Sequence, residues 1–218
     1  MSEMTAEEMG WTAVLEELRS ASGVEVSHEV LGAVEADPNP ESVPLDPGLV
    51  RCSPRFSEIG IQWGTVEPYA PVSGEFYLTP VASAIKGEAP DFSSDLHSES
   101  ERAVGAELRI IDDAPYTGAG MYTALRLQAG VANPEIWFAD HLRGLWRMDL
   151  DYREYLRVLA MTKGAFSWQH LFTDAPLDDS EFSRIPGRLT NMLDVLPRVF
   201  PDHDYEPLRE RLVERLAG

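Results

Sequence analysis

Four side chains with metal-binding chemistry stand where predicted strands end. Asp112 and Asp113 end one such strand, and Asp140 and His141 end a later one. Carboxylate oxygens and imidazole nitrogens ligate divalent metals, so these residues could support metal-assisted hydrolysis if the strand ends met. Their spacing does not require this, because acidic residues at strand-to-turn junctions more commonly cap the turn. A metal-assisted hydrolase is therefore one hypothesis, and turn capping is its structural alternative.

No local motif indicates a better-defined reaction. The five histidines lack the H-x-x-x-H or H-E-x-x-H spacing that places two imidazoles on one helical face. There is no G-x-S-x-G motif, and Gly118-Ala119-Gly120 is expected to be a turn needing positive φ rather than a phosphate loop. The single cysteine, Cys52, is expected to be a buried or half-buried structural thiol. We predict no cofactor and no resident metal, although a catalytic site assembled from distant segments stays open.

The charge balance is the most unusual property of the sequence. Thirty-seven acidic residues against 18 basic ones give a formal net charge of −19. A surface this negative repels phosphate backbones, which argues against nucleic-acid binding. It attracts basic proteins and accelerates their encounter, so a basic protein is the expected partner. The same charge would also keep a protein soluble without any specific partner, and composition alone does not separate the two roles.

One acidic stretch lacks apolar periodicity. Residues 86–105 are rich in Ser, Glu, Asp and Gly, which predicts an exposed loop. We expect this loop to form part of the surface that meets a basic partner. Its candidate contact residues are Asp91, Asp95, Glu99 and Glu101.

The elements that position these residues follow from periodicity. Thr5 and Glu8 form a capping box before a first helix, and a second short helix is predicted over residues 27–36. Strand patterns follow, beginning with the alternation of Ile59, Ile61 and Trp63. The other strand candidates are residues 75–79, 108–112, 122–128, 136–139 and 145–150. Helical patterns then return at residues 151–164, 185–200 and 206–216.

The segregation of strands from helices predicts an α+β fold with a central, mostly antiparallel sheet flanked by N-terminal and C-terminal helices. Residues 1–218 are expected to form a single domain. It would comprise N-terminal helices (1–36), a sheet-containing core (57–172) and C-terminal helices (185–217). The residues expected in the structural core are Trp63, Trp146, Tyr155, Gly164, Trp168 and Phe172.

The later part of the chain resembles a known family. Tyr155-Leu156 is followed by Thr162-Lys163-Gly164 and then by Trp168-Gln169-x-Leu171-Phe172. Upstream stand Trp63, Gly74-Glu75-Phe76-Tyr77-Leu78 and Ile110-Ile111-Asp112-Asp113. This order of elements resembles the SMI1/KNR4 family, also called the SUKH superfamily. The resemblance spans about residues 57–172, and it is most specific in the last thirty or so.

This resemblance implies an α+β fold with a non-catalytic binding role. Many bacterial members are immunity proteins that neutralise toxins, nucleases among them, and fungal relatives act as scaffolds. Because a nuclease binds a polyanion and is usually basic, an inhibitor with a net charge of −19 would be steered towards it. The leading hypothesis is a SUKH-like immunity protein that binds a basic toxin. A housekeeping interaction scaffold is the alternative within the same class.

The sequence also bears on the compartment. No apolar run approaches the roughly 20 residues that span a membrane. The N-terminal stretch MSEMTAEEMGW is acidic and does not resemble a secretory signal. We therefore expect a cytoplasmic bacterial protein that does not bind membranes, and the oligomeric state stays open.

Overall fold

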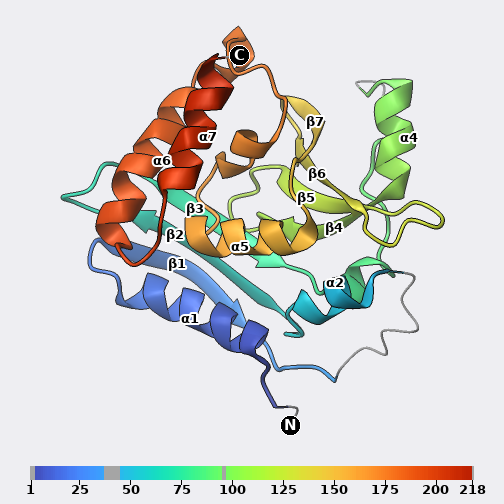
Figure 1. Cartoon of the computed structure of the whole chain (residues 1–218), viewed down its shortest axis with the longest axis horizontal. Helices are drawn as coiled ribbons and strands as arrows, with labels where there is room; N and C mark the ends of the chain where they lie inside the picture. The colour runs from blue at the N-terminus through green and yellow to red at the C-terminus, as the bar shows by residue number, and fades with distance from the viewer. Residues whose placement is uncertain (1–2, 37–44, 95–96, 218) are drawn as a thin grey trace.

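A seven-stranded antiparallel sheet is the centre of the fold (Figure 1). The computed structural model describes residues 3–36, 45–94 and 97–217. Each strand pairs with the next one along the chain, so the spatial order runs from β1 to β7. The strands are β1 (Val24–Leu31), β2 (Ile59–Thr65), β3 (Ser73–Leu78), β4 (Leu108–Asp113), β5 (Met121–Arg126), β6 (Glu135–Asp140) and β7 (Gly144–Arg147). The predicted α+β fold with a central antiparallel sheet is confirmed.

Helices precede and follow the sheet, as predicted. The longer ones are α1 (Ala6–Ser20), α4 (Glu99–Glu107), α5 (Tyr152–Thr162), α6 (Ile185–Val199) and α7 (Glu206–Ala217). Short helical turns are α2 (Pro47–Cys52), α3 (Val81–Ala84), η2 (Trp168–Phe172) and η3 (Ser180–Phe182). Figure 1 shows α5 crossing in front of the sheet with α6 and α7 beside it, whereas α4 stands apart from these helices. None of the helices among the described residues has the length and apolarity to cross a membrane.

The larger core lies on one side of the sheet, which we call the helix face. Alternation along the strands directs Trp63, Phe76 and Phe138 to this face, and all three are fully buried. They belong to one hydrophobic cluster that extends from Trp11 of α1 to Leu212 of α7. The N-terminal and C-terminal helices therefore share a single core with the sheet.

The opposite side of the sheet, which we call the α4 face, carries a second and smaller cluster. Tyr122, Ala124 and Ala139 of β5 and β6 pack there against Phe92 and Leu108. Phe92 lies in the segment before α4. The sheet thus has two covered faces, and α4 belongs to the smaller core.

The predicted helix over residues 27–36 is wrong. Its first half, residues 27–31, lies in β1, which pairs antiparallel with β2 from Val24 to Leu31. Val24, Val26 and Val30 are β-branched and therefore suit a strand, and pairing with β2 satisfies backbone groups of β1. Tertiary pairing outweighs the helical spacing of the apolar residues in this segment.

The segment 86–105 is not a loop throughout, because α4 begins within it. Ser98 and Glu101 form a capping box at the start of this helix. The ring of Phe92 lies so close to Gly105 that a Cβ there would be 2.4 Å from it. Few side chains of α4 are buried, so its apolar periodicity is weak, and the S-x-x-E motif was the usable signal.

The predicted core residues are buried to different degrees. Trp63, Tyr155 and Trp168 have almost no exposed surface, whereas Trp146 and Phe172 are only partly buried and pack at the margin of the core. Trp146 is marginal because β7 is an edge strand that ends at Arg147.

Glycine is required at position 164, where φ is 68° and a Cβ would lie 2.6 Å from the carbonyl oxygen of Glu75. Two smaller expectations are also confirmed. Cys52 is a buried free thiol. Gly118 and Gly120 have positive φ values of 59° and 66°.

Candidate functional site

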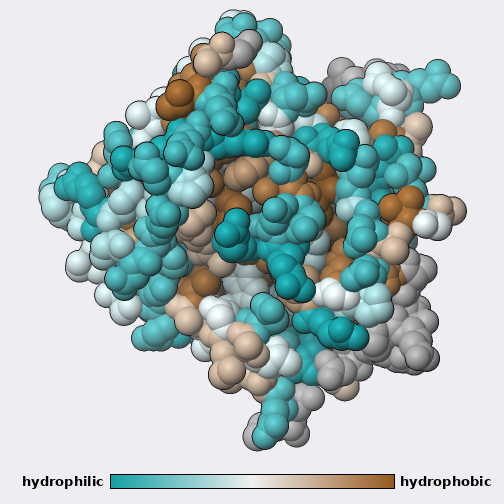
Figure 2. Space-filling model, viewed as in Figure 1, coloured by the Kyte–Doolittle hydropathy of each residue, from teal (hydrophilic) through white to brown (hydrophobic). Residues whose placement is uncertain are grey.

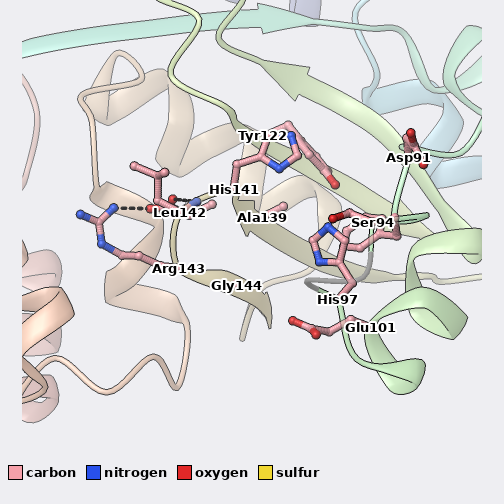
Figure 3. Close-up of a pocket in the computed structure, with 12 residues that line it drawn as sticks. Asp91, Ser94, His97, Glu101, Tyr122, Ala139, His141, Leu142, Arg143 and Gly144 are labelled. Carbon is pink, nitrogen blue, oxygen red and sulfur yellow. Dashed lines mark hydrogen bonds and ion pairs between the residues drawn. The ribbon is translucent and has the colours of Figure 1, made fainter.

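A pocket of about 410 Å³ opens on the α4 face of the sheet (Figure 3). One wall comes from β5, the end of β6 and the turn into β7, and includes Tyr122, Asp140 and His141. The other wall comes from residues 91–94, from His97 and from Glu101 in the first turn of α4. The pocket therefore joins residues from both sets that the sequence singled out, the acidic stretch and the strand ends.

Strand register places the tyrosine of this pocket. Tyr122 pairs with Ala139 across β5 and β6 and with Asp113 across β4 and β5. Its ring lies on the α4 face and is 7% exposed. Its hydroxyl makes no hydrogen bond to any other residue in the described ranges. Burial, with Asp113 nearby, raises the pKa of Tyr122 well above its ordinary value, so the hydroxyl is neutral at physiological pH.

Two carboxylates stand on the α4 side of the pocket. Asp91 Oδ1 accepts a hydrogen bond from the Ser93 amide at 2.8 Å. Glu101 Oε2 accepts from the amide and the hydroxyl of Ser98 at 2.8 and 2.7 Å. These hydrogen bonds lower the pKa of both carboxyl groups, which are therefore ionised at neutral pH. The Ser93 side chain also hydrogen-bonds the Asp91 carboxylate. Glu101 Oε1 has no hydrogen-bond partner within the described part of the chain.

Two histidines add aromatic surface to the pocket. The ring of His97 lies 4.6 Å from the ring of Phe92, and the ring of His141 lies edge-on to Tyr122 at 6.3 Å. Neither imidazole makes a hydrogen bond to another residue among those described. The pocket thus combines carboxylate oxygens with several ring faces.

An internal ion pair closes the pocket on the side of the β6–β7 turn. Asp140 is buried, and its Oδ2 lies 2.6 Å from Nη1 of Arg143. Its Oδ1 accepts a hydrogen bond from the Leu142 amide at 2.9 Å. Arg143 also donates to the carbonyl of Glu181. Asp140 therefore caps the turn, and its charge is neutralised by Arg143.

The structure does not bring the four predicted metal ligands together. Asp112 lies on the helix face, where it accepts hydrogen bonds from the Tyr155 hydroxyl at 2.6 Å and the Tyr77 amide at 3.0 Å. Asp113 accepts from the amide of Ala114, and β5 separates it from Asp140. Within the described ranges, no group of three or more His, Cys, Asp or Glu side chains could hold a metal ion. Asp113 and Asp140 instead cap turns.

Only some of the predicted partner-binding residues line the pocket. Asp91 and Glu101 line the pocket, whereas Glu99 is exposed in the first turn of α4 and does not line it. Asp95 lies outside the described residues. Sequence reasoning missed Tyr122 and His97 as pocket residues, because each becomes part of the site only when α4 packs on the sheet.

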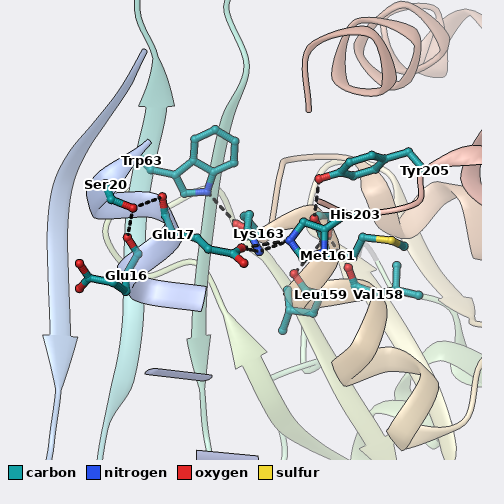
Figure 4. A network of polar contacts seen from close by, with 11 residues as sticks. Glu16, Glu17, Ser20, Trp63, Val158, Leu159, Met161, Lys163, His203 and Tyr205 are labelled. Atoms are coloured by element: carbon teal, nitrogen blue, oxygen red, sulfur yellow. Dashed lines mark hydrogen bonds and ion pairs between the residues drawn. The ribbon is translucent and has the colours of Figure 1, made fainter. Parts of the chain in front are cut away.

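A second polar cluster surrounds Lys163 (Figure 4). Its ammonium group contacts the Glu17 carboxylate, lies 3.2 Å from Nε2 of His203 and sits 5.4 Å from the centre of the Phe200 ring. Its carbonyl accepts a hydrogen bond from Nε1 of Trp63 at 2.7 Å. Burial lowers the pKa of Lys163, while Glu17 opposes that shift. The ion pair between Lys163, which follows α5, and Glu17 of α1 holds these two helices together. The Lys163 side chain is 0% exposed, so its ammonium group is not accessible to a ligand.

Comparison of the chain with protein-family models, with curated proteins and with solved structures yields no match. A function for this chain must therefore be argued from its own residues.

Proposed function

We propose that this chain is a non-catalytic protein-binding module of the SMI1/KNR4 type that neutralises a basic toxin. The observation that carries the proposal is the acidic pocket, which is lined by the ionised carboxylates of Asp91 and Glu101 and where Glu101 Oε1 has no hydrogen-bond partner among the described residues. Ionised carboxylates with unused acceptor atoms bind cationic groups well. A basic protein, such as a nuclease toxin, is the partner that this chemistry favours.

The charge of the whole chain supports the same partner. A net charge of −19 creates a negative field that steers basic proteins towards the surface. Figure 2 shows that hydrophilic residues cover much of the face seen in Figure 1, with hydrophobic residues visible between them. Long-range steering of this kind accelerates association and weakens as salt screens it.

The family resemblance is compatible with a binding site outside the residues that carry it. The residues that carry it, such as Tyr155, Gly164 and Trp168, are buried on the helix face or beneath it. They specify a scaffold, so a partner must contact other residues. The pocket lies on the opposite face and is built largely from connecting segments, which commonly carry binding residues.

A co-expression experiment tests the proposal. The chain would be produced together with each secreted toxin domain that is encoded beside its gene, and the domain against which it protects would serve as the toxin domain in the tests below. We expect cells to survive the toxin and the two proteins to elute together. A toxin that stays lethal and elutes alone would contradict an immunity role, whereas a complex with a non-toxic basic protein would favour the scaffold alternative.

The pocket carboxylates are expected to control the rate of association with this toxin domain. Combining Asp91→Asn with Glu101→Gln should lower the association rate constant about tenfold at low salt and flatten its salt dependence. The amide oxygens can still accept the hydrogen bonds from Ser93 and Ser98, so the local fold is kept. Stopped-flow mixing at several salt concentrations measures the effect.

A matched control separates the pocket from net charge. Glu88→Gln with Glu99→Gln changes the charge equally, at exposed positions that do not line the pocket. We expect this pair to slow association by less than about twofold. Equal effects of the two pairs would remove the pocket from consideration.

A further inference from the structure

We propose that the pocket binds the guanidinium group of an arginine side chain from the partner, an inference that rests on the proposed protein-binding function. The pocket brings together the hydroxyl of a largely buried tyrosine, which has no partner among the described residues, two ionised carboxylates and two imidazole rings (Figure 3). Each of these groups complements a different property of a guanidinium group.

The hydrogen-bonding atoms of the pocket complement those of arginine. A guanidinium group carries five N–H donors and no acceptor. The pocket offers the Asp91 and Glu101 carboxylates and the Tyr122 hydroxyl as acceptors. Two of these oxygens, Glu101 Oε1 and the Tyr122 hydroxyl, accept no hydrogen bond from the described residues. Because Tyr122 lines the pocket, a donor that enters the pocket can give its hydroxyl a partner.

The charge of the pocket favours a cation. Three acids and one arginine line it, which gives a formal charge of −2 with neutral histidines. Arg143 pairs with Asp140, so this charge resides on Asp91 and Glu101. Figure 3 shows the guanidinium group of Arg143 pointing away from His97 and Glu101. The guanidinium group of Arg143 therefore leaves the space near His97 and Glu101 open for an arginine of the partner.

The shape and lining select arginine over lysine. Tyr122, His97 and His141 present ring surfaces, and a planar guanidinium stacks on aromatic faces while binding carboxylates through its fork of donors. A lysine ammonium is a compact, strongly hydrated charge that uses neither property fully. The volume of about 410 Å³ is many times the roughly 30 Å³ that one water occupies in the liquid. It accommodates one extended side chain with some water.

The probe for this inference is a capped arginine, N-acetyl-arginine amide, titrated into the full chain. Nuclear magnetic resonance of the imidazole groups reports on the pocket through His97 and His141. We expect these two signals to shift saturably, with a dissociation constant on the order of millimolar for so small a ligand. Capped citrulline, which has the same shape without the charge, should cause no shift, and capped lysine should bind at least about fivefold more weakly.

Two conservative variants locate the binding groups. Tyr122→Phe and Glu101→Gln should each weaken capped arginine about tenfold, because each removes a hydrogen bond or charge to the guanidinium and preserves the shape of the side chain. Tyr116→Phe is the matched control, since Tyr116 stacks on His28 and does not line the pocket. It should leave binding unchanged.

The inference is overturned if capped arginine shifts neither His97 nor His141, if citrulline shifts them equally, or if Tyr116→Phe weakens binding as much as Tyr122→Phe does. Failure here and failure of the proposed function are distinguishable. A toxin domain that binds the chain while capped arginine does not would refute the arginine pocket alone. Capped arginine that binds, with no toxin domain forming a complex, would refute the immunity role alone.

Discussion

Replacing Asp112 with asparagine is expected to remove one contribution to the pH dependence of stability, a contribution that falls as pH rises from about 4 to 7. Burial raises the pKa of this carboxyl group from 3.8 to about 7. A folded-state pKa above the unfolded value stabilises the fold fully below pH 3.8, and this stabilisation is lost as pH rises through 7. At 1.36 kcal/mol per pKa unit, the loss is about 4 kcal/mol. Asparagine does not titrate, so the free energy of unfolding of the Asp112→Asn variant lacks this dependence on pH.

A buried histidine, His170, has the opposite effect on the pH dependence of stability over nearly the same pH range. His170 is fully buried among Phe138, Trp146 and Phe182, at ring distances of 5.2, 5.8 and 5.7 Å, and neither ring nitrogen has a hydrogen-bond partner among the described residues. Burial lowers its pKa from 6.5 to about 4. Its contribution is therefore present above pH 6.5 and is lost as pH falls towards 4, by about 3 kcal/mol.

The pH dependences that Asp112 and His170 give to the free energy of unfolding have opposite signs, so they should largely cancel in the wild-type protein. Urea unfolding between about pH 4.5 and 7.5 measures the free energy of unfolding of each variant. Relative to wild type, Asp112→Asn should gain stability as pH rises, and His170→Phe should lose it. Parallel curves for wild type and Asp112→Asn would show that Asp112 ionises normally in the folded protein.

Glu8→Gln is expected to destabilise the fold by about 3–5 kcal/mol, because it removes the carboxylate charge from a buried ion pair with Arg55. Glu8 is 1% exposed, and its carboxylate accepts from Nε and Nη2 of Arg55, both at 2.9 Å. It also completes the capping box with Thr5 at the start of α1. The hydrogen bonds from Arg55 lower the pKa of Glu8 to about 2. Its contribution is thus present above pH 4.5 and is lost as pH falls towards 2.

Urea unfolding at neutral pH tests this ion pair. Glu7→Gln is the control, since Glu7 is the exposed neighbour in the same helical turn and carries the same charge. It should change the free energy of unfolding by less than about 0.5 kcal/mol. Adding Arg55→Met to Glu8→Gln should recover part of the loss, because it removes the other buried charge of the pair as well. Equal effects of Glu7→Gln and Glu8→Gln would contradict the account of the pair.

The sheet could be predicted where side chains alternate clearly. Ile59, Ile61 and Trp63 face one core, so their period of two identified β2 directly. β1 could not be identified in this way, because it is an edge strand with few buried residues and its pairing with β2 is a long-range contact. Capping motifs predicted helix starts correctly because they involve residues only three apart in sequence. Thr5 with Glu8 and Asp151 with Glu154 are the examples.

The candidate site could be predicted only in part. Acidity and the absence of periodicity identified Asp91 and Glu101, which do line the pocket. Tyr122 was placed in a strand, but its role depends on α4 packing across the sheet, which no local pattern encodes. Lys163 was missed as a buried charge because hydropathy places lysine at the surface.

The most direct test of the pocket as the binding site is the dissociation constant of the toxin domain for Leu142→Arg. Leu142 lines the pocket and is 81% exposed, so arginine there adds a cation at the rim without disturbing the core. Val213→Arg, at a 68% exposed position on α7, makes the same change in charge away from the pocket. We predict that Leu142→Arg weakens binding more than about tenfold while Val213→Arg changes it less than about twofold. Equal dissociation constants for the two variants would contradict the pocket as the site of recognition.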